Sequence, residues 1–161
     1  MLAAAVVAVP GAVAVGDGTR EVSYRELDEW STRLARVLIE AGVGPERAVG
    51  VAMDRCLELV VAWWAVVKAG GTYVPVDRAY PVERIAMMLD AVQAVCVLTC
   101  AADAVAGAGT RPVLCIDRLD VSGRCPDAIT DADRLAPLGV DTTAYVMFTS
   151  GSTGAPKAVA V

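Results

Sequence analysis

The segment from Thr149 to Lys157, TSGSTGAPK, holds the residue types that a phosphate-binding loop needs. Its glycines let backbone amides approach an anion, its hydroxyls add short donors, and its lysine supplies a compact positive charge. Lysine is otherwise scarce, since Lys68 is the only other one in the chain. The alternative is a flexible Gly/Ser turn with a solvated lysine, which composition alone leaves open. The candidate phosphate-binding residues are Thr149, Ser150, Gly151, Ser152, Thr153, Gly154 and Lys157.

Two common nucleotide-binding motifs do not fit this chain. Gly151 and Lys157 have the separation of a Walker-type P-loop, but Pro156 stands where that motif has a glycine and removes a backbone donor. Ala158 replaces the Ser or Thr whose hydroxyl would hold Mg²⁺. No GxGxxG links the first expected strand and helix, so the sequence also argues against a dinucleotide-binding site.

A long amphipathic helix is predicted upstream of these motifs. Ser23 and Glu26 have the spacing of a capping box, and Gly42 suits the left-handed position that follows a helix ending near Ala41. Apolar residues recur between them at steps of three and four, which predicts one buried face. That face is expected to hold Leu27, Trp30, Leu34, Val37 and Leu38.

The remaining elements alternate between strands and helices. Asp54 should cap a second helix that ends at Gly70-Gly71, and Pro81 should occupy the first turn of a third. Segments 101–110 and 120–134 are rich in turn formers and should be surface connections. This order indicates an α/β fold with a mostly parallel sheet and flanking helices. Strands are expected at 12–15, 48–53, 72–75, 94–98, 113–116 and 145–148, and the second and third helices at 55–69 and 81–91.

The composition limits the classes of function. A chain of 161 residues that is 56% apolar is expected to form one folded domain and is not expected to be disordered. Its net charge of -5 argues against general binding to nucleic acid or to an anionic membrane, because both need a basic surface. The absence of histidine excludes Ser-His and Cys-His nucleophile pairs and His-ligated metal sites.

The cysteines and the N-terminus bear on the compartment. The Cys96 to Cys100 spacing lacks the paired CxxC knuckles of a zinc site, so no metal site is expected. MLAAAVVAVPGAVAV has an apolar core like a signal peptide, but the first basic residue is Arg20, and we expect a strand there instead. The longest clean apolar run, 59–67, is about half of the roughly 20 residues that a membrane span needs. Buried free thiols in a reducing cytoplasm are therefore expected at Cys56, Cys96, Cys100, Cys115 and Cys125.

Three ordered motifs carry a family resemblance. VSYREL lies near the start, VKAGGTYVPVDRAYPVERI in the middle, and AYVMFTSGSTGAPK near the end. Together they resemble the first three core motifs of amino-acid adenylation domains of nonribosomal peptide synthetases, which are adenylate-forming AMP-binding enzymes. The resemblance covers residues 10–161, and the middle motif separates this group from acyl-CoA synthetases and luciferases.

The resemblance implies a role for the loop and a set of ligands. In the family, the loop holds the β- and γ-phosphates of ATP while a carboxylate attacks the α-phosphate, and the seven candidate residues are the matching positions. ATP with Mg²⁺ is implied, although the magnesium ligand lies beyond the matched residues. An amino-acid substrate and a carrier-protein phosphopantetheine thiol are implied for the complete enzyme, with no nucleic acid and no membrane. Structural roles are implied for Tyr24, Glu26, Lys68, Gly70, Tyr73, Pro75 and Asp77.

The sequence departs from the family pattern at two positions. Ala158 stands where the family usually has glycine, and Arg78 where it usually has proline. Alanine would hinder the loop if that position needs a positive φ. Neither change removes a proposed donor side chain.

The length sets the expected domain. Residues 1–161 are expected to be the N-terminal part of an adenylation domain, that is, the N-terminal subdomain portion of an adenylate-forming enzyme, ending just after the phosphate loop. The isolated chain should then be inactive and cytoplasmic. Alternatives are a non-catalytic remnant or interaction module of a split synthetase, a fragment of a fatty-acyl or aryl acid adenylating enzyme, and a free-standing nucleotide-binding protein.

Overall fold

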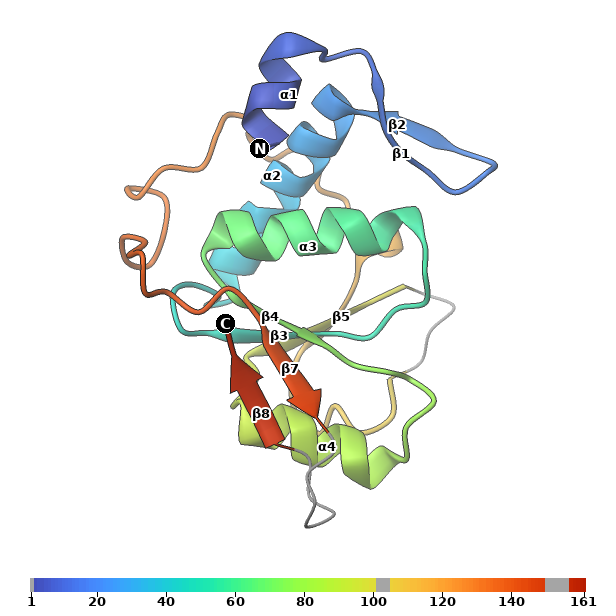
Figure 1. Ribbon diagram of the computed structural model, residues 1–161, viewed down its shortest axis with the longest axis vertical. Coiled ribbons are helices and arrows are strands. Elements are labelled where there is room, and N and C mark those ends of the chain that lie inside the picture. The colour runs from blue at the N-terminus through green and yellow to red at the C-terminus, as the bar shows by residue number, and fades with distance from the viewer. Residues whose placement is uncertain (1, 101–104, 150–156) are drawn as a thin grey trace.

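The predicted parallel sheet forms the centre of the molecule (Figure 1). Its four strands lie in the order β4-β3-β5-β6. The structure is a computed structural model that describes residues 2–100, 105–149 and 157–161. Helices α2 and α3 cover one face of the sheet and α4 covers the other. The helices are α1 (Leu2–Ala8), α2 (Tyr24–Glu40), α3 (Leu57–Ala69) and α4 (Val82–Ala91), with a 3₁₀ turn, η1, at Ile116–Arg118. The strands are β1 (Val13–Gly16), β2 (Glu21–Ser23), β3 (Ala48–Val51), β4 (Thr72–Pro75), β5 (Cys96–Thr99), β6 (Val113–Cys115), β7 (Val146–Thr149) and β8 (Lys157–Ala160).

The central strands are buried on both faces. All four residues of β3 and all four of β5 are buried. Val49 and Val51 belong to the apolar cluster with α2 and α3, whereas Ala48 belongs to the cluster with α4. Continuous apolar strands of this kind are typical of a parallel sheet with helices on both sides.

The capping box sets the start of α2 as predicted. Ser23 Oγ accepts a hydrogen bond from the Glu26 amide, and the Glu26 carboxylate accepts one from the Ser23 amide at 2.8 Å. The helix ends at Glu40, and Gly42 takes the expected positive φ of 91°. Leu27, Leu34 and Leu38 are buried, while Trp30 and Val37 are half-buried.

The predicted start of the second helix is wrong by two residues. Helix α3 begins at Leu57, and its N-cap is Cys56. Asp54 does not cap it, because its carboxylate accepts a hydrogen bond from Arg78 at 2.9 Å. Helix α3 ends as predicted, because Gly70 follows it in the left-handed conformation at φ 83°.

The other element boundaries are close to those predicted. Pro81 is the N-cap of α4 and not part of its first turn. The predicted strand over 113–116 ends at Cys115, because Ile116 begins the 3₁₀ turn. The expected connection over 120–134 contains no helix or strand and runs over the surface. In the other expected connection, residues 101–104 lie outside the described residues, and 105–110 form no helix or strand, although Ala108 is buried.

Two sequence expectations about the N-terminus and the thiols are corrected. Residues Leu2–Ala8 form helix α1, which packs on α2, and are not part of a strand. The alanines of this segment favour a helix, and Pro10 and Gly11 end it before the strand. The strand expected at 12–15 is present one residue later, as β1. The cysteines are free thiols, but only Cys96 is fully buried, and Cys125 is exposed. No helix among the described residues is long and apolar enough to span a membrane.

Candidate functional site

The two described ends of the predicted phosphate loop lie side by side. Thr149 is the last residue of β7 and Lys157 the first of β8, and the two are register partners in an antiparallel pair. Both residues are exposed. The other predicted site residues lie outside the described residues, and they are Ser150, Gly151, Ser152, Thr153 and Gly154.

Strand β7 is attached to the edge of the main sheet beside β4. Tyr145 forms a parallel bridge with Tyr73, whose amide donates to the carbonyl of Ala144 at 3.0 Å. Thr72 Oγ1 donates to the carbonyl of Thr143, also at 3.0 Å. Because β7 runs parallel to β4, its last residue points toward the carboxyl edge of the sheet. Open α/β sheets bind ligands at that edge.

One face of β7 packs against the core and the other is exposed. Val146 is 7% exposed and belongs to the apolar cluster under α4, and Phe148 packs against the same cluster. Met147 and all four residues of β8 are exposed. The main sheet and α4 therefore fix the strand that leads into the loop.

A ligand-sized cavity opens at the carboxyl ends of β3 and β4. Its volume is about 470 Å³, within the roughly 300–1,000 Å³ of small-molecule sites. Both signs of charge line it, and one pair, Arg78 and Asp54, is joined at 2.9 Å. Burial raises the pKa of Tyr73, which lines this cavity and packs against the apolar cluster of α2 and α3, above 10.0. The lining comprises Val51, Met53, Asp54, Arg55, Leu59, Tyr73, Pro75, Val76, Asp77 and Arg78.

Sequence reasoning missed this cavity. The resemblance implied structural roles for Tyr73, Pro75 and Asp77, and Arg78 was noted only as a departure from the family pattern. The available signal was the clustering of charges just after two predicted parallel strands, at Asp54 and Arg55 and again at Asp77 and Arg78. Residues in those positions meet at one edge of a parallel sheet.

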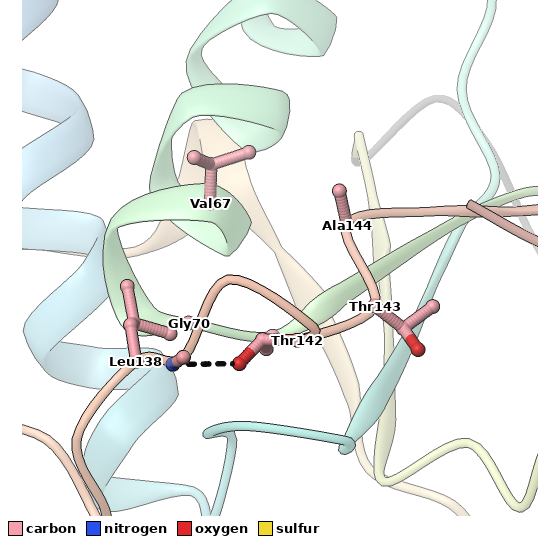
Figure 2. Close-up of a pocket in the computed structure, with 8 residues that line it drawn as sticks. Val67, Gly70, Leu138, Thr142, Thr143 and Ala144 are labelled. Carbon is pink, nitrogen blue, oxygen red and sulfur yellow. Dashed lines mark hydrogen bonds between the residues drawn. The ribbon is translucent and has the colours of Figure 1, made fainter.

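A second, smaller pocket lies at the opposite ends of β4 and β7. Figure 2 shows its lining, which includes Val67 and Gly70 at the end of α3 and Leu138 and Ala144 from the segment before β7. The Gly139 amide donates to Thr142 Oγ1 at 3.0 Å, which folds that segment around the pocket. Its volume of about 150 Å³ is below the roughly 300 Å³ at which small-molecule sites begin. A nucleotide does not fit there.

The middle sequence motif joins two helices. Lys68 Nζ lies 2.7 Å from Asp28 Oδ1 and 2.8 Å from both Ser31 Oγ and Thr32 Oγ1. Its side chain is 17% exposed. Burial lowers the pKa of Lys68 below 10.5, although the hydrogen bond and the charge of Asp28 act to raise it. Lys68 therefore links α3 to α2, in agreement with the structural role implied for it.

Comparison with known proteins gives the family. The sequence model of the AMP-binding enzyme family matches residues 2–161. The chain belongs to the AMP-binding enzyme family. The expected resemblance to nonribosomal peptide synthetase adenylation domains is confirmed by sequence relatives and solved structures.

Sequence relatives of this AMP-binding chain are much longer than it is. It is 40% identical over 158 residues to a dimodular nonribosomal peptide synthase of Bacillus subtilis (strain 168), covering 94% of this chain and 7% of the relative. It is 44% identical over 155 residues to phosphinothricin tripeptide synthetase PhsC of Streptomyces viridochromogenes, covering 94% of this chain and 14% of the relative. The chain thus spans only a small part of the curated relatives that it matches.

Solved structures share the fold. The nonribosomal peptide synthetase FmoA3, in its form with bound α-methyl-L-serine-AMP, aligns with this chain at a TM-score of 0.85 and 32% identity. The alignment covers 99% of this chain and 17% of FmoA3. The N-terminal subdomain of Klebsiella oxytoca NpsA matches 99% of this chain over 40% of its own length, with a TM-score of 0.80 and 29% identity. The fold of this AMP-binding chain is that of part of an adenylation N-terminal subdomain.

Proposed function

We propose that this chain supplies the phosphate loop of an adenylation domain that activates an amino acid with ATP for nonribosomal peptide synthesis. Residues 1–161 would form the N-terminal part of that domain. The product would be an aminoacyl-adenylate, which a carrier-protein thiol then receives. The complete reaction needs further parts of a longer protein, because the chain spans between 2% and 14% of relatives such as CymA of Salinispora arenicola and PhsC.

One observation carries the proposal: Thr149 and Lys157, the last residue of β7 and the first of β8, are register partners at the end of the two strands where the loop sequence connects them. This pairing brings a hydroxyl residue and the lysine of TSGSTGAPK to one place at the carboxyl edge of the fold. A triphosphate needs such a combination of short donors and positive charge. FmoA3, whose structures include forms with bound AMPPNP and with α-methyl-L-serine-AMP, supports the same ligand class.

The role of these residues would be positioning and charge compensation. Lys157 would neutralise part of the charge of the β- and γ-phosphates, and the hydroxyls of Thr149, Ser150, Ser152 and Thr153 would donate to phosphate oxygens. Loop amides at the glycines would add further donors. The amino-acid carboxylate would attack the α-phosphate, and pyrophosphate would leave. Such electrostatic help is worth about 10²–10³-fold in rate for a single donor.

The magnesium ion implied by the resemblance has no assigned ligand in this chain. Ala158, beside Lys157, offers no oxygen from its side chain. The family usually has glycine at that position, which offers no side-chain oxygen either, so we assign the ion to no described residue.

The test is amino-acid-dependent ATP–pyrophosphate exchange by the full-length protein that carries this chain. With the correct amino acid, Lys157→Ala should lower exchange by about 10²-fold or more while leaving the unfolding midpoint unchanged, because Lys157 is exposed. Arg25→Ala is the matched control, since it removes another exposed positive charge outside the loop. Exchange that is absent with every proteinogenic amino acid, or equal in Lys157→Ala and the parent, would refute the proposal.

A second candidate has an observation in its favour. The NpsA N-terminal subdomain has also been solved in complex with 3-hydroxybenzoyl-AMSN, and it matches 99% of this chain with a TM-score of 0.80 and 29% identity. An aryl acid would then take the place of the amino acid. Exchange that depends on hydroxybenzoates and not on amino acids would favour this candidate.

A further inference from the structure

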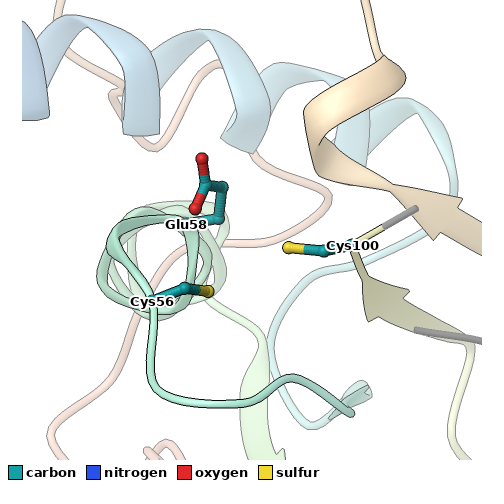
Figure 3. A group of neighbouring side chains, drawn as sticks. All are labelled: Cys56, Glu58 and Cys100. Atoms are coloured by element: carbon teal, nitrogen blue, oxygen red, sulfur yellow. The ribbon is translucent and has the colours of Figure 1, made fainter. Parts of the chain in front are cut away.

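Three potential metal ligands meet at the start of α3. Among the described residues, Cys56, Glu58 and Cys100 each offer one ligand atom, and these atoms all lie within 4.8 Å of one another. Figure 3 shows both sulfurs directed into the space between α3 and the end of β5. Cys56 is the N-cap of α3, Glu58 is in its first turn, and Cys100 directly follows β5.

The pairing of two strands brings these distant residues together. Val51 at the end of β3 is the register partner of Leu98 in β5. Beyond that pair, the Ala52 amide donates to the Leu98 carbonyl at 2.9 Å, and Thr99 Oγ1 donates to the Ala52 carbonyl at 3.0 Å. The chain segments that lead to Cys56 and Cys100 are thus fixed at one edge of the sheet.

The carboxylate of the cluster is held in place from its far side. Arg20 donates to both oxygens of Glu58, at 2.8 and 3.1 Å, and Arg20 in turn lies 2.9 Å from Asp17. The Glu58 side chain is only 7% exposed. Each carboxylate oxygen has a second lone pair, so the bonds from Arg20 leave room for a metal ion. Outer partners that orient a ligand in this way are usual at metal sites.

The donor set and its charge select a class of ion. Two thiolates and one carboxylate carry three negative charges, which a divalent cation and the Arg20 guanidinium would balance. Thiolate ligands select zinc-like ions, whereas Mg²⁺ and Ca²⁺ require oxygen ligands. Three protein ligands leave the fourth tetrahedral position to water.

The geometry is close to that of a tetrahedral site. With metal–sulfur bonds of about 2.3 Å, the ligands of such a site lie about 3.8 Å apart. The present limit of 4.8 Å therefore requires the two sulfurs to approach each other by no more than about 1 Å. Each sulfur and the Glu58 oxygen would approach by no more than about 1.3 Å, because metal–oxygen bonds are slightly shorter. Cys56 and Cys100 are half-buried, so neither residue is fully enclosed by the fold.

We propose that Cys56, Glu58 and Cys100 bind a thiophilic divalent cation of the Zn²⁺ class, which joins the start of α3 to the end of β5. This site revises the sequence-based expectation that the chain holds no metal. That expectation rested on the spacing of Cys96 and Cys100 along the chain. The proposed site instead pairs Cys100 with a cysteine that lies far away in sequence and near it in the fold.

Cobalt provides the first test, because thiolate ligands give Co²⁺ an intense charge-transfer absorption. Titration of the reduced chain should saturate at one Co²⁺ per chain, and Zn²⁺ should displace it. Cys56→Ser and Cys100→Ser should each remove about half of the absorption per bound ion and weaken binding at least about tenfold. Glu58→Gln should weaken binding but keep the absorption. Cys125→Ser is the matched control, since Cys125 is exposed and outside the cluster, and it should behave like the parent.

A second measurement needs no variant and so does not depend on whether a variant folds. The parent chain is alkylated with and without Zn²⁺, and the modified cysteines are identified by mass spectrometry. Zn²⁺ should protect Cys56 and Cys100 and leave Cys125 unprotected. The proposal would be overturned if Zn²⁺ changed the labelling of none of the five cysteines. It would also be overturned if the cobalt absorption survived in the Cys56→Ser/Cys100→Ser double variant. A Cys56–Cys100 disulfide that persists in reductant and prevents cobalt binding would overturn it as well.

Discussion

Replacing Lys68 by methionine tests whether the middle sequence motif acts through stability. Methionine keeps most of the volume of the side chain but removes the ammonium group. Lys68 Nζ has three N–H donors and four oxygen acceptors within 2.8 Å, which are Asp28 Oδ1, the Asp28 carbonyl, Ser31 Oγ and Thr32 Oγ1. All of these acceptors belong to α2, so the substitution removes a polar link between two helices.

Two opposing effects set the magnitude. Each hydrogen bond from a charged donor contributes about 1.5–3 kcal/mol. Against this, removing the ammonium recovers part of its desolvation cost, several kcal/mol, and that same desolvation lowers the pKa of Lys68. Asp28 is 28% exposed and remains hydrated, and Ser31 Oγ keeps its bond to the Leu27 carbonyl at 2.6 Å. Together these effects should lower the free energy of unfolding of Lys68→Met by about 2–3 kcal/mol. In a chain of this size, that corresponds to a decrease of roughly 4–12 °C in the unfolding midpoint.

The assay is urea unfolding of the parent and of two variants. Lys157→Met is the matched control, because Lys157 is the only other lysine of the chain and is exposed. It should change the free energy of unfolding by no more than about 0.5 kcal/mol. If Lys68→Met were as mild as this control, the four short contacts would contribute no net stability and the reasoning would be refuted.

The pH dependence of the same variants gives an independent check. Burial holds the pKa of Lys68 below its unfolded value of 10.5, so the unfolded state binds more protons between these two values. The contribution of Lys68 to the free energy of unfolding should therefore increase as the pH rises from the folded-state pKa to 10.5. Comparing the parent with Lys68→Met isolates this contribution, since the tyrosines titrate in both proteins.

Two further predictions concern the core and the start of α2. Gly50→Ala should destabilise the chain by about 1–3 kcal/mol in urea unfolding, because the new Cβ would lie 2.6 Å from Cδ2 of the fully buried Leu89; an unchanged midpoint would contradict this packing. Ser23→Ala should cost about 1 kcal/mol at neutral pH. Hydrogen bonds from Ser23 lower the pKa of Glu26 below 4.5, so the part of this contribution that depends on the Glu26 carboxylate is present above pH 4.5 and lost as the pH falls. The bond from the Glu26 amide to Ser23 Oγ does not titrate, so the difference between the two proteins should narrow in acid without vanishing.

Much of the fold could be predicted because local signals agree with the tertiary structure. Ser23, Glu26 and Gly42 mark both ends of α2, and Gly70 marks the end of α3 by its left-handed conformation. Asp54 misled the prediction, since a capping residue can also form an ion pair, here with Arg78 across the sheet edge. No local pattern distinguishes those two uses.

The candidate sites were predictable to different degrees. Residue types alone identify TSGSTGAPK as a phosphate-binding candidate, and the structure adds that its two described ends, Thr149 and Lys157, are register partners. The charged cavity and the Cys56–Glu58–Cys100 cluster depend on which strands are neighbours. Their residues are brought together by the parallel pairing of β3 with β4 and β5, which spacing along the chain does not reveal.

The attachment of β7 to β4 has a consequence for ligand affinity. A single bridge between Tyr73 and Tyr145 and the bonds to Ala144 and Thr143 join the two strands, whereas β3 and β4 pair along their full lengths. A junction with so few bonds opens at a lower free energy than the central sheet and exchanges its amide hydrogens sooner. A nucleotide that binds only the closed form would show an apparent affinity reduced by the fraction of open molecules. Changes at Thr72 would then weaken nucleotide binding through this opening equilibrium, without any contact to the nucleotide.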